Sequence, residues 1–254
     1  MGMMKCYRRT NALVRTRLLA MCAALATVLL CAMPADARMR NDKLLNRPYA
    51  DNRAWHLGFG IGLQSLDLAL THNGFTTADG ETWFMEQPSW SPGFTINALV
   101  DFRLNSWFNV RLSPGMYFGN RIIKMVDTTL GSQENQNLKS TFVALPVDLR
   151  YSALRFGNLK PYLTAGVMGV ADVAKKRDDY LRLRTFDTYI TVGFGCDFYL
   201  PFFKLNPELK FCFGLGDILQ HDRPDLADNP SAMKFTKSLS KARSNMVMLT
   251  FFFE

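Results

Sequence analysis

The sequence predicts an all-β fold: an eight-stranded antiparallel transmembrane β-barrel that inserts into an outer membrane after an N-terminal signal peptide is cleaved. Three observations lead to this prediction. The first 37 residues have the charge and hydropathy pattern of an export signal. The remaining chain alternates apolar and polar residues over repeated stretches of about ten positions. The chain also ends in an aromatic strand, Phe251-Phe252-Phe253, which resembles the terminal signal that barrel-assembly machinery recognises.

The N-terminal segment, residues 1–37, is predicted to be a cleavable signal peptide. Five basic residues precede an uncharged run of 16 residues, Leu18 to Met33, and Ala35-Asp36-Ala37 supplies small residues for cleavage after Ala37. An uncleaved anchor is the alternative, although a spanning helix needs about 20 residues. A lipoprotein is disfavoured, because neither Cys22 nor Cys31 follows the small residue that lipoprotein cleavage requires.

Loss of the signal peptide changes the composition of the mature chain. The formal net charge falls from +8 to +4, because five of the 30 basic and one of the 22 acidic residues leave. The high isoelectric point therefore indicates no nucleic-acid partner. Cys196 and Cys212 remain and are too few for a disulfide framework. They fall on opposite strand faces, outward and inward respectively, and we expect two small buried hydrophobic side chains.

Residues 38–54 are predicted to form a periplasmic arm and residues 55–254 the barrel, of about the size of OmpA or OmpX. Eight stretches show the alternation: 55–66, 93–104, 108–119, 143–151, 162–173, 186–200, 203–215 and 244–254. The stretch 162–173 is the weakest, because Met168 and Val170 share a face with Thr164 and Gly166. An even number of strands is the expected one for such a barrel.

The connections predict the orientation in the membrane. Long gaps at 67–91, 120–138, 174–183 and 218–242 alternate with short turns at 105–106, 153–159 and 201–202. Long loops outside and short turns in the periplasm are the usual arrangement. An aromatic girdle then falls on the periplasmic side, made of Trp55, Phe102, Phe108, Tyr151, Phe198, Phe203 and Phe253. A soluble secreted barrel or sandwich is the competing interpretation, but its glycine-rich faces would pack poorly in a core.

The face assigned to the barrel interior, or lumen, carries balanced charges. Five cations, Arg103, Arg111, Arg150, Lys204 and Lys210, share this face with five carboxylates, Asp101, Asp148, Asp187, Asp197 and Glu208. Glycines on the same face, at 58, 60, 62, 193, 195, 214 and 216, would make room for the long cationic side chains. Because eight strands enclose a space that side chains can fill, the pattern favours a neutralised plug over an ion-selective pore.

No catalytic constellation is evident. His56 lies in the first predicted strand, and His72 and His221 lie in two loops; none has a neighbouring nucleophile, cysteine or carboxylate at catalytic or metal-ligand spacing. The acidic residues after His221 are better explained by a solvated loop. We therefore expect no enzymatic activity, no cofactor, no metal site and no small-molecule substrate, and function in the loops, the periplasmic rim or the lipid-facing wall.

Five segments resemble the PorT family, called SprT in gliding bacteria. They are Asn46-Arg47-Pro48-Tyr49-Ala50-Asp51 with His56-Leu57-Gly58-Phe59, the stretch from Pro114 to Arg121, Leu145-Pro146 with Arg150-Tyr151, the run from Tyr199 to Lys210, and Phe253-Glu254. The likeness extends over essentially the whole mature chain. Single segments are not unique, but their combination and order are fairly specific.

The resemblance implies a role in the type IX secretion system of Bacteroidota, which carries surface proteases and adhesins with a C-terminal signal domain across the outer membrane. It implies no catalytic residues. Other secretion components would be partners, besides outer-membrane lipid, and would dock on the arm, Arg38 to Arg53, or on the long loops. A disordered arm is an equal alternative. The rival function is a generic small barrel acting as adhesin, wall element or narrow channel.

Overall fold

A computed structural model describes residues 46–74, 83–86, 91–127, 133–174, 183–220 and 238–254. The predicted signal peptide, the first part of the predicted arm and His221 lie outside these ranges. Within them, no helix has both the length and the apolar composition that a membrane crossing requires.

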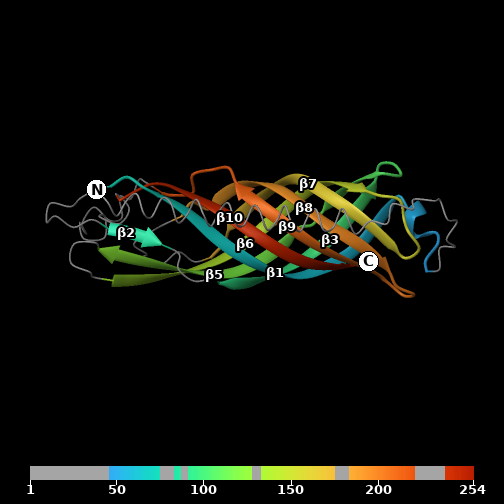
Figure 1. Ribbon diagram of the computed structural model, residues 1–254, viewed down its shortest axis with the longest axis horizontal. Helices are drawn as coiled ribbons and strands as arrows, with labels where there is room; N and C mark the ends of the chain where they lie inside the picture. Colours follow the sequence, from blue (N-terminus) through green and yellow to red (C-terminus); the bar gives the residue numbers. More distant parts are fainter. Residues whose placement is uncertain (1–45, 75–82, 87–90, 128–132, 175–182, 221–237) are drawn as a thin grey trace, which may run out of the picture. The chain divides into compact units, whose positions relative to one another are not determined.

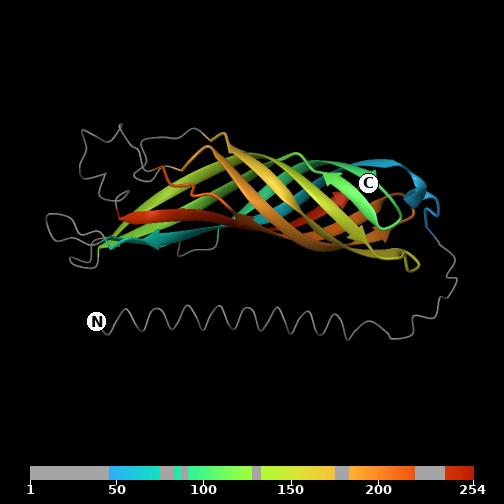
Figure 2. The same cartoon turned by 90° about the horizontal axis from the view of Figure 1, so that it is seen from above.

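The described strands form one antiparallel sheet that closes into a ring (Figure 1; Figure 2). Around the ring the order is β1 (Trp55–His72), β10 (Leu239–Phe253), β9 (Lys204–Gly214), β8 (Phe186–Tyr199), β7 (Leu159–Asp172), β6 (Gln133–Ser152), β5 (Gly115–Asp127) with β4 (Phe108–Leu112), and β3 (Pro92–Arg103). β1 pairs with β10 on one side and with β3 on the other. Closure of this kind satisfies the backbone hydrogen bonds that lipid cannot satisfy.

The ring has eight strands, because β4 and β5 are two parts of one strand. Both pair with β3 and with β6. They are separated at Ser113-Pro114, where proline has no N–H to donate, while its carbonyl still accepts a 2.8 Å hydrogen bond from the Ala98 N–H. A short strand, β2 (Trp83–Glu86), pairs with the far end of β5. The predicted eight-stranded antiparallel barrel is confirmed.

At the end that carries the long connections, the strands run further than predicted. The parts of the predicted loops 67–91, 120–138 and 218–242 that belong to strands are 67–72, 83–86, 120–127, 133–138 and 239–242. The prediction was wrong there because it required an apolar outer face throughout. The alternation continues in these parts, but its direction reverses.

β1 shows the reversal. From Trp55 to Leu63 its outward side chains are apolar, each at least half exposed. Beyond Leu63 the outward positions are polar or small, and the inward Leu66 and Leu68 are buried. β10 changes in the same way, with apolar Val247 to Phe253 outward in one half and Asn245, Arg243 and Lys241 outward in the other. We call the first half the belt region and the second the loop-end extension.

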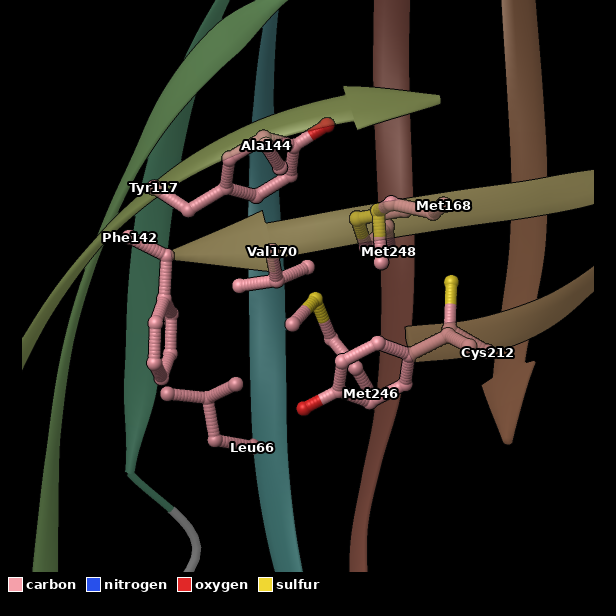
Figure 3. Packing of buried hydrophobic residues seen from close by; sticks show 10 residues of the cluster. Leu66, Tyr117, Phe142, Ala144, Met168, Val170, Cys212, Met246 and Met248 are labelled. Carbon is pink, nitrogen blue, oxygen red and sulfur yellow. The ribbon is translucent and has the colours of Figure 1, made fainter. Parts of the chain in front are cut away.

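An inner apolar cluster crosses the lumen where the belt region meets the loop-end extension. Its members are Leu66, Tyr117, Phe142, Ala144, Met168, Val170, Tyr189, Cys212, Met246 and Met248. Figure 3 shows side chains from several strands pointing toward one another within the ring. A second cluster, which includes Leu68, Ile123, Met125 and Ala242, fills the extension. Met168 and Val170 on β7 are therefore inward core residues, which explains the weak outward pattern of that strand.

Candidate functional site

The half of the lumen nearest the short turns, which we call the lower lumen, is filled by ion pairs centred on Arg111. The half nearest the long connections is the upper lumen. The Arg111 guanidinium contacts Asp101 at 3.1 Å, Glu208 at 2.9 Å and the Glu254 side chain at 3.4 Å. Arg150 pairs with Asp197 and lies 3.5 Å from Asp101. Lys204 bridges Asp197 and Glu254, and Lys210 contacts Asp148 at 2.6 Å and Glu208 at 3.0 Å. All these side chains are almost fully buried, so the network is a plug of mutually compensated charges.

Aromatic rings complete this layer. The Arg150 guanidinium lies 3.7 Å from the centre of the Tyr162 ring, and Arg111 lies between Tyr162 and Phe252 at 5.3 and 5.2 Å. Two of the predicted inward glycines make room for these rings. A Cβ at Gly195 would lie 2.5 Å from Tyr162, and a Cβ at Gly60 would lie 2.5 Å from Phe252. The glycines therefore accommodate the charged side chains indirectly, through the rings stacked beside them.

Eight of the ten predicted lumen charges lie in this network. The two exceptions are at its ends. Arg103 lies at the short-turn end, where it donates to the carbonyl oxygens of Asp51 and Asn105. Asp187 lies toward the loop end and makes no ion pair among the described residues; its Oδ1 accepts the backbone N–H of Thr188. The prediction missed Glu254, although its even number places it on the inward face of β10 with Phe252.

The prediction also missed Arg121, which lay in an expected loop. It points inward from β5, is 1% exposed, and lies between the two apolar clusters. It donates one hydrogen bond to the Ser244 hydroxyl at 3.2 Å, and its guanidinium lies 5.5 Å from the centre of the Phe142 ring. Nε and Nη1 have no hydrogen-bond partner in the described part of the chain. Together with the inner apolar cluster, Arg121 obstructs the lumen above the ion-pair plug.

The short-turn end forms a mouth that residues 46–53 cover. The Asn46 side-chain amide donates to the carbonyl of Tyr199 at 3.0 Å, and Arg47 donates to the carbonyl of Glu254 at 3.0 Å. Arg155 donates in return to the carbonyls of Asn46 and Arg47. This part of the predicted arm is thus neither a disordered leader nor a free docking segment, because it caps the barrel's own mouth.

Asp51, in the short 3-10 helix η1 (Ala50–Asn52), is the main polar anchor of this cap. The Tyr199 hydroxyl donates to its carboxylate, and Lys160 Nζ lies 3.1 Å away. Burial raises the pKa of Asp51, but the hydrogen bond from Tyr199 and the charge of Lys160 outweigh it, so the pKa lies below its usual 3.8. Asp51 is therefore ionised at neutral pH and holds the cap by charge.

Two open cavities flank the cap. One, of about 480 Å³, is lined by residues that include Arg47, Arg53, Trp55 and Glu254. The other, of about 190 Å³, is lined by residues that include Arg103, Asn109 and Leu154. Arg53 is exposed and makes no ion pair among the described residues. The mouth therefore presents a hollowed, basic surface to whatever lies outside it.

The histidines and cysteines do not form a site within the described ranges. His56 Nδ1 is 4.0 Å from Glu254 in the plug. His72 was assigned to a loop, but it ends β1 and accepts the N–H of Met85 at 2.9 Å. Cys196 is partly exposed and Cys212 is buried in the inner apolar cluster, on the predicted faces, and both are free. No three His, Cys, Asp or Glu residues in these ranges are grouped as a metal site would require.

The comparison with protein families agrees with this architecture. Residues 41–220 match a family model described as the outer membrane protein beta-barrel domain. No curated protein matches the sequence. Among solved structures, similar folds include the outer membrane protein OprG from Pseudomonas aeruginosa (14% identity, 78% of this chain and 94% of that chain, TM-score 0.46). Neisserial surface protein A is also similar (12%, 79% and 98%, TM-score 0.38), as is the attachment invasion locus protein Ail of Yersinia pestis (10%, 79% and 99%, TM-score 0.35).

Proposed function

The chain belongs to the outer membrane protein beta-barrel domain family, and on that premise we propose that it is a non-enzymatic accessory component of type IX protein secretion. Its place is the outer membrane, with the mouth in the periplasm and the loop-end extension outside the cell. We propose further that the periplasmic mouth is the surface on which other secretion components dock.

The filled lumen is the observation that carries this proposal. Buried ion pairs occupy its lower part and apolar side chains its upper part. A polypeptide could pass only if both layers were dismantled, which would leave several buried charges without partners. The barrel is therefore unsuited to be the conduit for secreted proteins, and its contribution to secretion has to come from its surfaces.

The positions of the segments that resemble the PorT family support the mouth as that surface. Three of the five segments contribute residues that contact one another there, and a fourth is linked to them through one further residue. Asn46 and Arg47 bond to Tyr199 and Glu254, Asp51 accepts from Tyr199, and Lys204 pairs with Glu254. Arg150 joins the same network through Asp197. A family-specific sequence gathered at one end of a barrel is expected if partners recognise that end.

A deletion strain complemented with variants tests the role in secretion. We expect the deletion to leave proteins with the C-terminal signal domain in the periplasm, and the wild-type gene to restore their export. Normal export in the deletion strain, with altered adhesion or permeability, would contradict the proposal. Planar-bilayer recordings of the purified protein should show no conductance steps; stable open channels would contradict the sealed lumen.

Two variants test the mouth as the docking surface. Deleting residues 38–45 removes the arm preceding the cap but leaves the contacts of Asn46 and Arg47 in place, unlike a deletion that extends to residue 52. Arg53→Glu reverses an exposed charge that takes part in no described ion pair. Each should insert normally yet retain fewer secretion components in affinity purification. A matched reversal of an exposed cation at the other end, Lys124→Glu, should leave this co-purification unchanged.

The rival function, a small barrel that displays its loops for adhesion, is favoured by a different observation. The loop-end extension raises the long connections above the lipid on a rigid, apolar-filled wall. Such a platform suits contacts with surfaces outside the cell. Loss of adhesion with unimpaired export would support this function instead.

A further inference from the structure

Four cations without an ion-pair partner among the described residues lie on the outer face of the loop-end extension. They are Lys139 on β6, Arg184 just before β8, and Lys241 and Arg243 on β10, and we call them the cation collar. Three are exposed and Lys241 is partly exposed. No carboxylate among the described residues pairs with any of them. Lys124 on β5 also faces outward, but Glu86 of β2 lies opposite it in the register, so it is not included.

The collar lies just above the apolar belt. Arg243 precedes the belt residue Val247 by four positions in β10, and Lys139 precedes Val143 by four in β6. Arg184 precedes Phe186 by two. With a rise of about 3.3 Å per residue and a strand tilt of about 40°, four positions raise a side chain by roughly 10 Å. Lys and Arg side chains can reach several ångströms back toward the lipid. Their charged groups therefore fall at the depth of the outer-leaflet headgroups.

The collar does not simply reflect a basic composition. At the mouth, Arg155 and Lys160 turn inward and both pair with Asp51. At the loop end the cations turn outward, and Asp67 on β1 is the one exposed carboxylate among the side chains that the structure describes there. Asp67 faces Asn245 in the register, one outward position from Arg243, yet the two side chains form no ion pair. The side chains that the structure describes on this surface thus leave its positive potential uncompensated.

We infer that the cation collar binds the phosphate groups of the phosphorylated glycolipid in the outer leaflet. Phosphate oxygens are strong acceptors for Arg and Lys, and anionic headgroups attract cations placed at the membrane surface. The collar is distributed over β6, the start of β8 and β10, which are alternate strands of the ring. The strands that carry the cations are thus about 10 Å apart around the wall. An annulus of lipids fits this distribution better than a single protein partner, which would require one compact patch.

The apolar side chains beneath the collar complete the site. Phe186 is 76% exposed below Arg184, and Val247 is 42% exposed below Arg243. Acyl chains attached to a phosphorylated headgroup would lie against these side chains. A free inorganic phosphate would gain nothing from them, so the lipid is the expected occupant.

The test uses the purified full-length protein in detergent, titrated with bisphosphorylated lipid A and with the same lipid lacking its phosphates. We expect the phosphorylated form to bind more tightly, with an affinity that falls as salt rises. In K139Q/R184Q/R243Q the affinity should drop about fivefold per lost cation, roughly 100-fold in total. The charge-preserving variant K139R/R184K/R243K should bind nearly as well as the wild type. Asp67→Asn should bind a few-fold more tightly.

Three results would overturn the inference. Equal binding of the two lipids would assign the interaction to the apolar belt alone. Displacement of lipid A by an equal concentration of inorganic phosphate would identify a free-anion site. Unchanged lipid binding by the triple glutamine variant would remove the collar from the interaction, and its unaltered heat-modifiable mobility on gels would show that it had folded.

Discussion

The belt region and the loop-end extension are built from the same strands but are inverted with respect to each other. In the belt region, apolar side chains such as Ile61 face out and the ions around Arg111 face in. In the extension, Leu68 and Ile123 face in, while Ala69 and Arg243 face out. The solvent on the outside explains the difference, because lipid requires an apolar outer face and water requires an apolar inner one. The position of the inversion marks the membrane boundary on the wall.

The largest effect is expected from removing the centre of the ion-pair plug. Arg111→Met leaves the carboxylates of Asp101, Glu208 and Glu254 short of a buried cation. We expect a loss of about 3–5 kcal/mol in the free energy of unfolding, the usual result of breaking a buried ion pair. Urea unfolding in lipid vesicles, followed by tryptophan fluorescence, measures it. Arg111→Lys should lose less, and a loss under about 1 kcal/mol for Arg111→Met would show that water fills the lower lumen.

The inversion itself can be tested by placing one cation on each side of the boundary. Ile61→Arg puts a charge on the lipid face of the belt region and should cost about 2–4 kcal/mol. Ala69→Arg makes the same type of change on the outer face of the extension. Arg243 lies opposite it in the register and repels it, so we expect a cost of no more than about 1 kcal/mol. The same unfolding measurement compares them. Equal costs at the two positions would mean that the membrane boundary does not lie between them.

The inner apolar cluster should respond as a packed core. Met168 is fully buried in it, whereas Met116 faces lipid from β5 and is 43% exposed. Met168→Ala should cost about 2 kcal/mol through the cavity it leaves. Met116→Ala should cost well under that, because lipid chains can fill the space. Similar costs for both methionines would argue that the upper lumen is loosely packed.

The smallest effect is expected at the mouth, in the dependence of the cap on pH. Because the pKa of Asp51 is lower in the capped state than its usual 3.8, proton binding favours release of the cap. The stabilising contribution is complete above pH 3.8 and is lost as the pH falls through the lowered pKa. Hydrogen exchange of residues 46–53 should therefore be slow at pH 7 and faster, relative to the intrinsic rate, near pH 3. Asp51→Asn should remove this pH dependence while leaving the strands protected.

Several features were predictable because they depend only on the alternation of residues. The number of strands follows from the number of alternating stretches, and the inward face of the predicted lumen charges follows from odd and even numbering. Glu254 could have been found by the same rule, since it shares parity with the inward Phe252. Arg121 was missed for another reason, because the predicted stretch ended at Gly119, whereas β5 continues to Asp127.

The height of each side chain along the barrel axis could not be predicted. Arg103 and Asp187 have the same inward parity as Arg111 and Asp197, but the register of neighbouring strands places them at opposite ends of the plug. The cap at the mouth was equally hidden. It joins Asn46 to Tyr199 and Arg47 to Glu254, and no local pattern relates residues so distant in the chain.

The sequence by itself determined that this chain builds an eight-stranded wall with one apolar and one polar face, because side chains alternate with period two and each face must suit its solvent. Tertiary structure alone decided which charges meet in the plug, where the two faces exchange character, and that residues 46–53 close the barrel's own mouth. Those outcomes depend on how far neighbouring strands are shifted against one another, and that shift is fixed only when the ring closes.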